Sequence, residues 1–579
     1  YEMSASLVGS EMCIRDSILS AIKTWKGESI VSNYEMTIYH GESLKTHIEN
    51  TLTGIDKERF IASQLRDYLN APNDRKVCCL YGLRRTGKTT MMLQEIERIG
   101  DYDKCLLLHC ESGSSVMQIR KMIEAYPDSK YIFVDEATKA QNFISTASVL
   151  SDNYAAEGKK IILAGTDSLG FALARKDELY DRVHFIHTTY IPFREQHELL
   201  GTGIMDYIRY GGTLSPEGVF YNKEQTGEYS NSAIVFNITH SLERWNQGRN
   251  NGILDGAVRR GDLPSYINKV LEYNNRQFLA SIINSDFKSH DIGSLADLLT
   301  KSGSADPELL YPSGNDEASI KAREDLTDRI RIALHIKENP IPVDPECVQA
   351  IIHFLKEMDV LYELPEKSGE PSYLFTQSGM RYSQAKDEAE ALLNTDVFRN
   401  GEYSMVEQKE ILDKLEQDIS GHVLEDIVLY QAIQSAKEIG GSVVASKYEP
   451  KTYVGEFDVF FADLERRTAC AVEVKLSDKQ TEKQVRHLTN KQLCEAFEKE
   501  TGAEIQNKIV LYQGKSAFNP FQATTPEDKV LYMNVETFLK QPEQLMQALL
   551  QEPVSDKKHF QSLMKAAGEK TPHKDDITR

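Results

Sequence analysis

Residues Gly82–Thr89 constrain the fold of this 579-residue chain more than any other segment. They read Gly-Leu-Arg-Arg-Thr-Gly-Lys-Thr and match the phosphate-binding pattern G-x-x-x-x-G-K-[ST]. The apolar run 76–81 before them predicts a buried strand, and the run 90–98, which lacks Gly and Pro, predicts a helix. Such a loop wraps its backbone amides around phosphates, so we expect a nucleotide site in an α/β domain. The alternative is a Gly-rich turn without a ligand.

Each side chain of this phosphate loop has an expected role. Lys88 should reach the β- and γ-phosphates, and the hydroxyl of Thr89 should hold Mg²⁺. The expected cofactors are therefore ATP and Mg²⁺. The predicted nucleotide-binding residues are Gly82, Arg85, Thr86, Gly87, Lys88, Thr89 and Thr90.

A second motif is an apolar run that ends in Asp135 and Glu136. Asp135 is expected to complete the Mg²⁺ shell, and Glu136 to polarise the attacking water as general base. The run 160–168 predicts another buried strand, from whose end Thr166 should touch the γ-phosphate or the water; a polar strand cap is the alternative. Arg182 is a candidate cationic finger, acting in cis or on a neighbouring subunit.

These motifs together resemble a family of prokaryotic AAA-type ATPases that carry a Gly-x-Arg-Arg-x-Gly-Lys-Thr loop and a C-terminal restriction-endonuclease-like domain of unknown role. The resemblance covers most of the chain after residue ~60. The sequence departs from the family pattern at 166–167, where Gly-Ser-Ser is usual, and at 181–182, where Gly-Arg is usual. Beyond the phosphate loop, the resemblance rests on 134–137, 162–168, 191–195 and 207–212.

The C-terminal part contains a second candidate site. Two apolar runs around Asp458 and Glu473, separated by a polar turn, predict an antiparallel hairpin. Glu473 and Lys475 are two apart on a strand and share one face, and Asp458 can lie alongside. The two carboxylates would bind Mg²⁺ or Mn²⁺, and Lys475 would activate water for phosphodiester attack. This Asp…Glu-x-Lys arrangement resembles that of the restriction-endonuclease-like nucleases. Glu425 resembles the extra acidic residue that these nucleases carry on their first helix. A structural domain with a solvated charge cluster is the alternative.

A possible DNA-binding module precedes this site. A helix beginning near Asp344 has apolar residues at 348, 351, 352, 355 and 358, and two short strands at 360–364 and 373–377 follow. A helix with a two-stranded wing suggests a winged helix, which can bind DNA or pack against a neighbour. This helix carries one Lys and no Arg, which favours packing.

The expected fold is α/β with several domains, since a chain of this length can bury more than one core. Residues 1–17 resemble a translated sequencing-library adapter and are expected to be non-native, with a native tail as the alternative. The expected segments after residue 17 are a helical lead-in at 18–75, a doubly wound P-loop ATPase domain at 76–200, a helical lid or spacer at 201–315, a winged-helix-like domain at 316–395, an α/β restriction-endonuclease-like domain at 396–550 and a polar tail at 551–579.

Composition limits the partners of the chain. The formal net charge of −21 argues against nucleic-acid binding over the whole surface. The stretch from Lys447 to Lys491 has nine Lys/Arg against eight Asp/Glu, which leaves room for a local groove. The eight cysteines include no C-x-x-C pair, which indicates reduced thiols in a cytoplasmic protein. No apolar run approaches the ~20 residues of a membrane span, so no membrane partner is expected.

Two functions remain open. The first is an ATPase coupled to DNA binding or processing through the nuclease-like domain. The second is a nucleotide-switched regulatory protein whose inactive C-terminal domain docks a protein partner or another copy of the chain.

Overall fold

The structure of the chain is a computed structural model. The structure describes residues 36–214, 254–285, 344–364, 372–395, 405–450 and 455–569, with shorter gaps at 73, 112, 144–146, 167–169, 172–178, 255, 257–259, 261 and 524–527. The expected non-native segment 1–17 lies outside the described residues. So do most of the expected lid, the turn of the expected wing and the last residues of the expected tail.

The N-terminal part is built on a six-stranded sheet with the order β1-β3-β4-β5-β2-β6. β2 to β6 pair in parallel, and β1 pairs with β3 in antiparallel orientation at one edge. The expected alternation of strands and helices around a parallel sheet is thereby confirmed. The strands are β1 (Met36–His40), β2 (Val77–Tyr81), β3 (Cys105–Cys110), β4 (Tyr131–Asp135), β5 (Lys160–Gly165) and β6 (Val183–His187).

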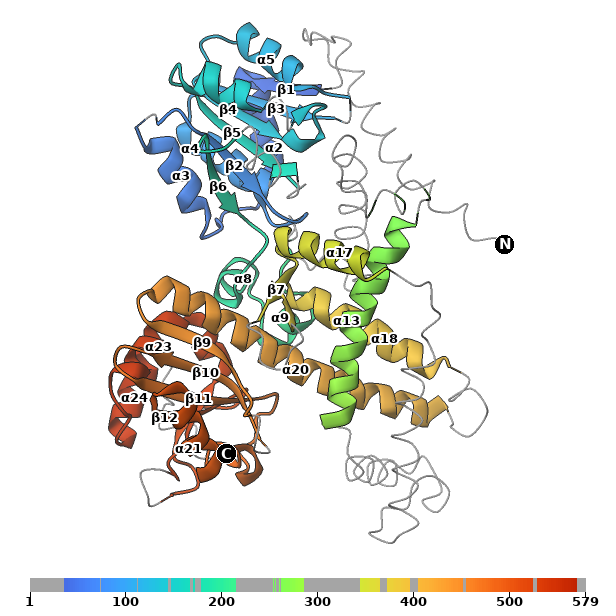
Figure 1. Ribbon diagram of the computed structural model, residues 1–579. Helices are drawn as coiled ribbons and strands as arrows, with labels where there is room; N and C mark the ends of the chain where they lie inside the picture. Colours follow the sequence, from blue (N-terminus) through green and yellow to red (C-terminus); the bar gives the residue numbers. More distant parts are fainter. Residues whose placement is uncertain are drawn as a thin grey trace.

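Helices cover both faces of this sheet and complete what we call the N-terminal α/β domain (Figure 1). One apolar core lies beneath α2, α3 and α4, and a second core lies beneath α5 on the opposite face. The strands read as continuous apolar runs because they are buried on both sides. The helices are α2 (Gly41–Thr51), α3 (Ala62–Asn70), α4 (Lys88–Ile99) and α5 (Val116–Ala125).

The lead-in to this domain differs from the expectation of helices alone. Met36–His40 form β1, which pairs with β3 from Met36–Cys110 to His40–Leu106. The domain therefore begins well before residue 76. A five-residue edge strand is too short to show a clear alternation of apolar and polar residues in the sequence. Its pairing with β3 is what identifies it as a strand of this sheet.

Of the described elements in the middle of the chain, α8, α9 and α17 lie between the two sheets in Figure 1, and α13 and α18 lie to one side. The apolar face expected on α17 is buried: Ile351, Ile352, Leu355 and Met358 belong to a core shared with α13. β7 and β8 form the expected antiparallel hairpin after this helix. The elements here are α8 (Phe193–Leu200), α9 (Ile204–Tyr210), α13 (Leu263–Ser285), α17 (Pro345–Glu357), β7 (Leu361–Glu363), β8 (Tyr373–Phe375) and α18 (Ser378–Leu393).

The C-terminal α/β domain contains a second six-stranded sheet, with the order β13-β14-β12-β11-β10-β9. β11, β12 and β14 are parallel, and β9, β10 and β11 form an antiparallel meander. The long helix α20 shares a core with one face, and α21 covers the other. The elements are α20 (Met405–Ile439), β9 (Val443–Tyr448), β10 (Phe457–Asp463), β11 (Thr468–Lys475), α21 (Lys491–Thr501), β12 (Glu504–Tyr512), β13 (Ala517–Phe518), β14 (Leu531–Asn534), α22 (Val535–Lys540), α23 (Pro542–Gln551) and α24 (Lys557–Ala566).

The expected polar tail at 551–579 contains a packed helix, α24. Asp556 precedes this helix and caps it, because its side chain accepts from the backbone amide of His559. Phe560 and Met564, four residues apart on one face, are buried in the core that α20 shares with the sheet. The surrounding charged residues concealed this short apolar stripe in the sequence.

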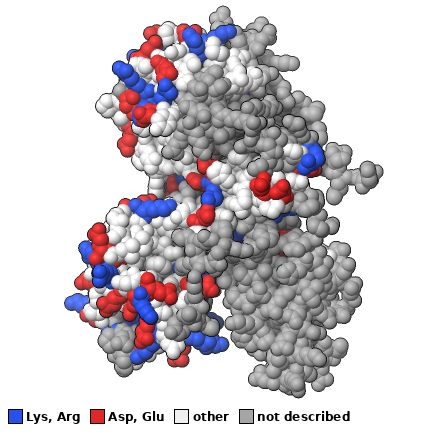
Figure 2. Space-filling view, in the orientation of Figure 1, with Lys and Arg blue, Asp and Glu red and all other residues white. Residues whose placement is uncertain are grey.

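On the face shown in Figure 2, the acidic and basic side chains of the described residues are intermixed over both α/β domains. Among the described helices, none is long and apolar enough to cross a membrane.

Replacing Phe560 by Ala should lower the free energy of unfolding by about 3–5 kcal/mol, because it removes a large side chain from a packed core. Urea denaturation monitored by circular dichroism measures the change. The exposed neighbour Gln561, replaced by Ala, is the matched control and should change stability by less than about 0.5 kcal/mol. Equal midpoints for the two variants would show that α24 does not contribute to the core.

Candidate functional site

The phosphate loop Gly82–Thr89 connects β2 to α4 at the carboxyl edge of the first sheet. Gly82 has a φ of 146°, and a Cβ there would lie 2.5 Å from the hydroxyl oxygen of Thr188. Gly87 precedes α4 with a φ of 86°, in the left-handed region that favours glycine. Both glycines of the motif are therefore required by the backbone, independently of any ligand.

Lys88 lies inside this loop. Its side chain is buried, and its Nζ donates to the carbonyls of Gly82 at 2.9 Å and Leu83 at 2.7 Å. Burial lowers the pKa of Lys88 to about 8, although Glu136 and Asp135 favour the charged form. The ammonium is thus held at the loop, which is where a phosphate would be bound.

Thr89 and Asp135 meet as the sequence predicted for a Mg²⁺ site. The Thr89 hydroxyl donates to Asp135 Oδ2 at 2.9 Å, from α4 to the end of β4. Burial raises the pKa of Asp135, but hydrogen bonds from His109 and Thr89 outweigh burial, so the net pKa is lowered. A hydroxyl and an ionised carboxylate are oxygen ligands of the kind that Mg²⁺ prefers.

His109 is a member of this site that the sequence analysis missed. Its Nδ1 lies 3.4 Å from Asp135 Oδ2, and the hydrogen bond to Asp135 raises the pKa of His109. The two residues are directly opposite in the parallel pairing of β3 with β4. A polar residue near the end of an otherwise apolar strand was the available signal, because the carboxyl ends of parallel strands share one edge.

Glu136 and Thr166 also come together at this edge. Thr166 follows β5, which lies between β4 and β2 as expected, and its hydroxyl donates to Glu136 Oε2 at 3.2 Å. Glu136 has a φ of 51°, an uncommon value for a residue other than glycine. The structure thus places Thr166 against the predicted base itself.

The remaining predicted loop residues, Arg85, Thr86 and Thr90, differ in burial and in their hydrogen-bond partners. Thr86 is buried, and its hydroxyl donates to the Leu83 carbonyl at 2.9 Å and lies 2.7 Å from the Thr188 hydroxyl. Arg85 is exposed with a φ of 62°, and its carbonyl accepts from the backbone amide of Leu214 at 2.8 Å. Thr90 lies in the first turn of α4. The Thr86 side chain therefore shapes the loop rather than facing a ligand.

Arg182 does not lie near the phosphate loop. The next residue, Val183, pairs with Val77 at the start of β2, whereas the loop follows Tyr81 at its end. Arg182 contacts Asp152 at 2.9 Å. A finger acting in cis is therefore wrong, because parallel strands place their two ends on opposite edges of the sheet. A finger acting on a neighbouring subunit stays a prediction.

The predicted carboxylate cluster of the C-terminal α/β domain is assembled around Lys475. Its Nζ lies 3.0 Å from both Asp458 Oδ2 and Glu473 Oε2, across the expected hairpin of β10 and β11. The side chains of the two carboxylates are 5% and 3% exposed, so a buried pair of like charges is balanced by a lysine that is itself 32% exposed. Glu425 approaches from α20: burial, and then the charge of Asp458, raises its pKa.

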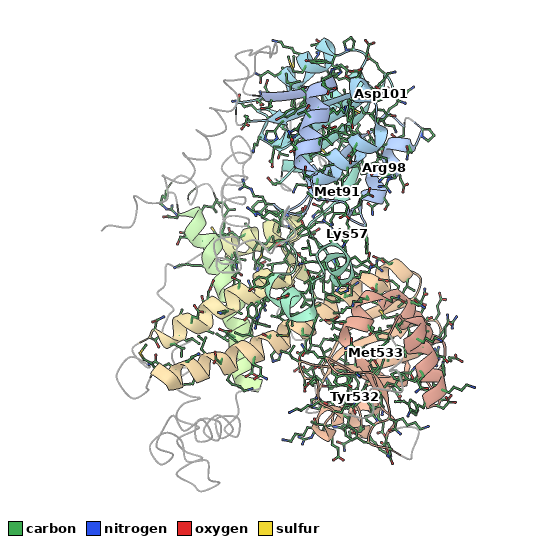
Figure 3. The ribbon with its side chains drawn as sticks, turned by 180° about the vertical axis from the view of Figure 1, so that it is seen from behind. Lys57, Met91, Arg98, Asp101, Tyr532 and Met533 are labelled. Atoms are coloured by element: carbon green, nitrogen blue, oxygen red, sulfur yellow. The ribbon has the colours of Figure 1, made fainter. Side chains whose placement is uncertain are left out.

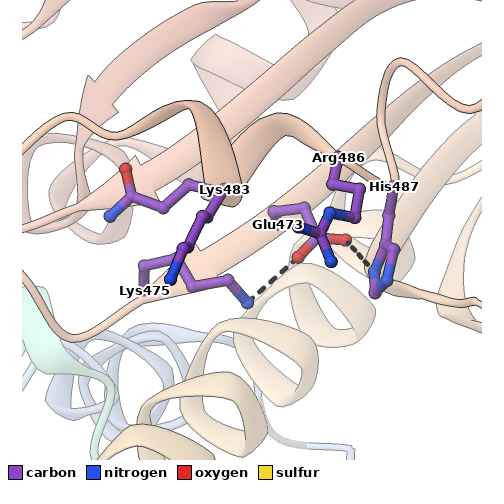
Figure 4. Close-up of a pocket in the computed structure, with 6 residues that line it drawn as sticks. Glu473, Lys475, Lys483, Arg486 and His487 are labelled. Atoms are coloured by element: carbon purple, nitrogen blue, oxygen red, sulfur yellow. Dashed lines mark hydrogen bonds and ion pairs between the residues drawn. The ribbon is translucent and has the colours of Figure 1, made fainter. Parts of the chain in front are cut away.

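A cavity of about 270 Å³ opens beside Glu473 and carries cationic side chains that the sequence analysis did not single out (Figure 4). His487 Nδ1 lies 3.2 Å from Glu473 Oε1, and this hydrogen bond raises the pKa of His487. The signal of this cavity in the sequence was the near-neutral charge of the stretch from Lys447 to Lys491. The lining residues are Glu473, Lys475, Lys483, Gln484, Arg486 and His487.

The carboxylates of this cluster, Asp458 and Glu473, are paired with Lys475 rather than arranged around an open metal position. Within the described part of the chain, no group of three or more His, Cys, Asp or Glu side chains is arranged to hold a metal ion. Lys475 also lies between Asp458 and Glu473, where a cation bridging the two carboxylates would have to enter. The metal site there stays a prediction.

Comparison with known proteins bears on the N-terminal α/β domain. Residues 74–197 match the family model of an AAA domain, a range that runs from just before β2 into α8. No curated protein matches the chain.

Two similar solved structures are a Saccharomyces cerevisiae Hsp104–ADP complex and Aeropyrum pernix ORC1 in complex with DNA. Hsp104 is 13% identical with a TM-score of 0.23 and covers 69% of this chain, which spans only 61% of the Hsp104 chain. ORC1 is 13% identical with a TM-score of 0.20, covering 60% of this chain and 94% of its own. TM-scores this low support no argument about function.

Replacing Lys475 by Met should lower the free energy of unfolding by up to about 3–5 kcal/mol at pH 7, because Asp458 and Glu473 lose their shared counter-ion. Burial already raises the pKa of Glu473, so the loss should shrink as the pH falls and the carboxylate takes up a proton. Denaturation at pH 7 and pH 5 measures this. The exposed Lys483, replaced by Met, should show no such pH-dependent loss; equal losses would show that Lys475 does not balance the buried carboxylates.

Proposed function

Since residues 74–197 match an AAA domain, we propose that this chain binds ATP with Mg²⁺ and hydrolyses it. The observation that carries the proposal is the hydrogen bond between Thr89 and Asp135, which joins the phosphate loop to the second acidic motif at one edge of the sheet. Lys88 and the loop amides would bind the phosphates, and Thr89 with Asp135 would hold Mg²⁺. The bound ion neutralises phosphate charge.

Glu136 takes the role of general base in this proposal. It directly follows Asp135 on the same strand end, so it is beside the metal ligands without being one of them. The hydroxyl of Thr166 orients its carboxylate by donating to Oε2. A carboxylate positioned in this way can take the proton of an attacking water. Arg182 could contribute only across an interface between copies of the chain, which makes a homo-oligomer part of this proposal.

Replacing Lys88 by Ala should abolish or greatly weaken ATP binding, because the ammonium that meets the phosphates is lost. Replacing Glu136 by Gln should retain binding but lower kcat by roughly 10²–10⁴-fold, because the base is lost. Phosphate release and equilibrium binding with Mg·ATP distinguish the two effects. Lys121 on the exposed face of α5, replaced by Ala, is the control. Hydrolysis unchanged in both site variants would refute the proposed function.

A second function, in the C-terminal α/β domain, is supported by the cavity beside Glu473. Lys475, Lys483, Arg486 and His487 gather there around one carboxylate, in a chain that is otherwise strongly acidic. Local positive charge next to a carboxylate pair suits a nucleic-acid phosphate. The domain would then bind or cut DNA with a second divalent ion, in keeping with the expected restriction-endonuclease-like fold. A winged helix formed by α17 with β7 and β8 would add to this role.

The alternative is that the C-terminal α/β domain is an inactive docking platform switched by nucleotide. Incubating the full chain with plasmid DNA and Mn²⁺ separates the two. Cleavage that is lost in Asp458→Asn and in Glu473→Gln supports the nuclease. Arg486→Gln should weaken DNA binding, whereas Arg466→Gln, on the exposed turn between β10 and β11, should not. Absence of both cleavage and DNA binding in the wild type would leave the docking platform.

A further inference from the structure

One arginine outside the sequence motifs lies against the phosphate loop. Arg59 precedes α3 and is only 5% exposed. Its Nη1 donates to the backbone carbonyl of Thr86 in the loop, and also to that of Thr188 at 3.2 Å. Its Nη2 donates to the carbonyl of Tyr190 at 3.1 Å. A single buried side chain thus joins the loop to the connection between β6 and α8.

Glu195 on α8 fixes this arginine in place. Its carboxylate is 2% exposed and accepts from Arg59 Nε at 2.6 Å and from Nη2 at 3.3 Å. The same carboxylate accepts from the backbone amide of Phe60 at 2.7 Å. A two-point contact of this kind sets the plane of the guanidinium, and it neutralises a charge that would be costly if buried alone.

The hydrogen bond to Thr86 has a consequence for phosphate binding. The carbonyl of Thr86 and the amide N–H of Gly87 belong to one planar trans peptide, so they point in opposite directions. Drawing the carbonyl toward Arg59 turns the Gly87 N–H away from Arg59. Amides of such a loop bind phosphate oxygens. Arg59 therefore controls the orientation of a group that would contact ATP, although it does not contact ATP itself.

The residue next to Glu195 faces the opposite way. Arg194 Nη1 lies 2.9 Å from Glu543 Oε2 on α23 of the C-terminal α/β domain. Glu543 Oε1 in turn accepts from the Ser435 hydroxyl on α20. On the other side, Lys57 Nζ donates to the carbonyl of Glu198 at 2.7 Å, and Figure 3 shows Lys57 at the end of the N-terminal α/β domain nearest α8. Helix α8 thus contacts both α/β domains.

We propose that Arg59 and Glu195 form a clamp that positions the phosphate loop for nucleotide, and that α8 transmits the state of the loop to the C-terminal α/β domain. The proposal rests on ATP binding at the loop, the function proposed above. Arg59 acts as a positioning residue through the Thr86 peptide. Arg194 acts at the second contact of the same helix. Coupling between two sites is reciprocal, so the contact with Glu543 should influence ATP affinity.

The clamp is tested by measuring Mg·ATP affinity of the full chain by calorimetry. Arg59→Lys keeps the charge but cannot reach the four acceptors, and Glu195→Gln keeps the shape but removes the charge. We expect each to raise the Kd for ATP by at least about tenfold, the range of a typical coupling. Melting temperature without nucleotide is recorded in parallel, since a purely structural role would lower it and leave the Kd of the folded protein unchanged.

Transmission through α8 is tested with variants that do not touch the loop. Arg194→Gln and Glu543→Gln should each change the Kd for ATP several-fold, and their combination should not exceed the larger single effect. Glu500→Gln is the matched control, since its carboxylate accepts from Tyr448 elsewhere in the same domain. It should bind ATP as the wild type does.

The outcomes separate the two proposals. A wild type that does not bind ATP would overturn the proposed function. A wild type that binds ATP, with Arg59→Lys and Glu195→Gln variants of unchanged Kd, would overturn the clamp alone. Unchanged affinity in both Arg194→Gln and Glu543→Gln would overturn transmission through α8.

Discussion

The buried ion pair between Arg59 and Glu195 is the interaction on which the arrangement of the nucleotide site depends. Both side chains lie almost entirely out of contact with water, so every donor of the guanidinium must be matched by an acceptor. Those acceptors are supplied by three separate segments: the phosphate loop, the connection after β6 and α8. Moving any one segment would leave a buried charge unsatisfied, and this holds the segments together.

The phosphate loop is also fixed by packing on its other sides. Gly82 is pressed against Thr188 and Thr189, where no Cβ fits. The adjacent Leu83 is buried in the core that α13 and α17 form, so the loop is part of the middle of the molecule as well as of the first sheet. This dual packing means that a change in the loop cannot stay confined to the N-terminal α/β domain, because close-packed interiors transmit displacement.

In the C-terminal α/β domain, two buried carboxylates share one lysine as their counter-ion. Asp458 and Glu473 are two like charges in a buried position, and their mutual repulsion is costly without a counter-ion. Lys475 stands between them at 3.0 Å from each and balances the pair. Burial still raises the pKa of Glu473, and His487 contributes a further hydrogen bond. The cluster is therefore an ion network in which Lys475 occupies the position between the two carboxylates.

Features that depend on local spacing could be read from the order of the residues. Glycine positions specify the phosphate loop, apolar runs specify the strands around it, and alternation places Glu473 and Lys475 on one face of a strand. Contacts between segments that are far apart in the chain became visible in the folded structure alone. This structure placed Arg182 at the wrong edge for catalysis in cis, made an edge strand of 36–40 and buried Arg59 beneath the loop. Strand register and core packing set these contacts, and neither leaves a periodic signal along the chain.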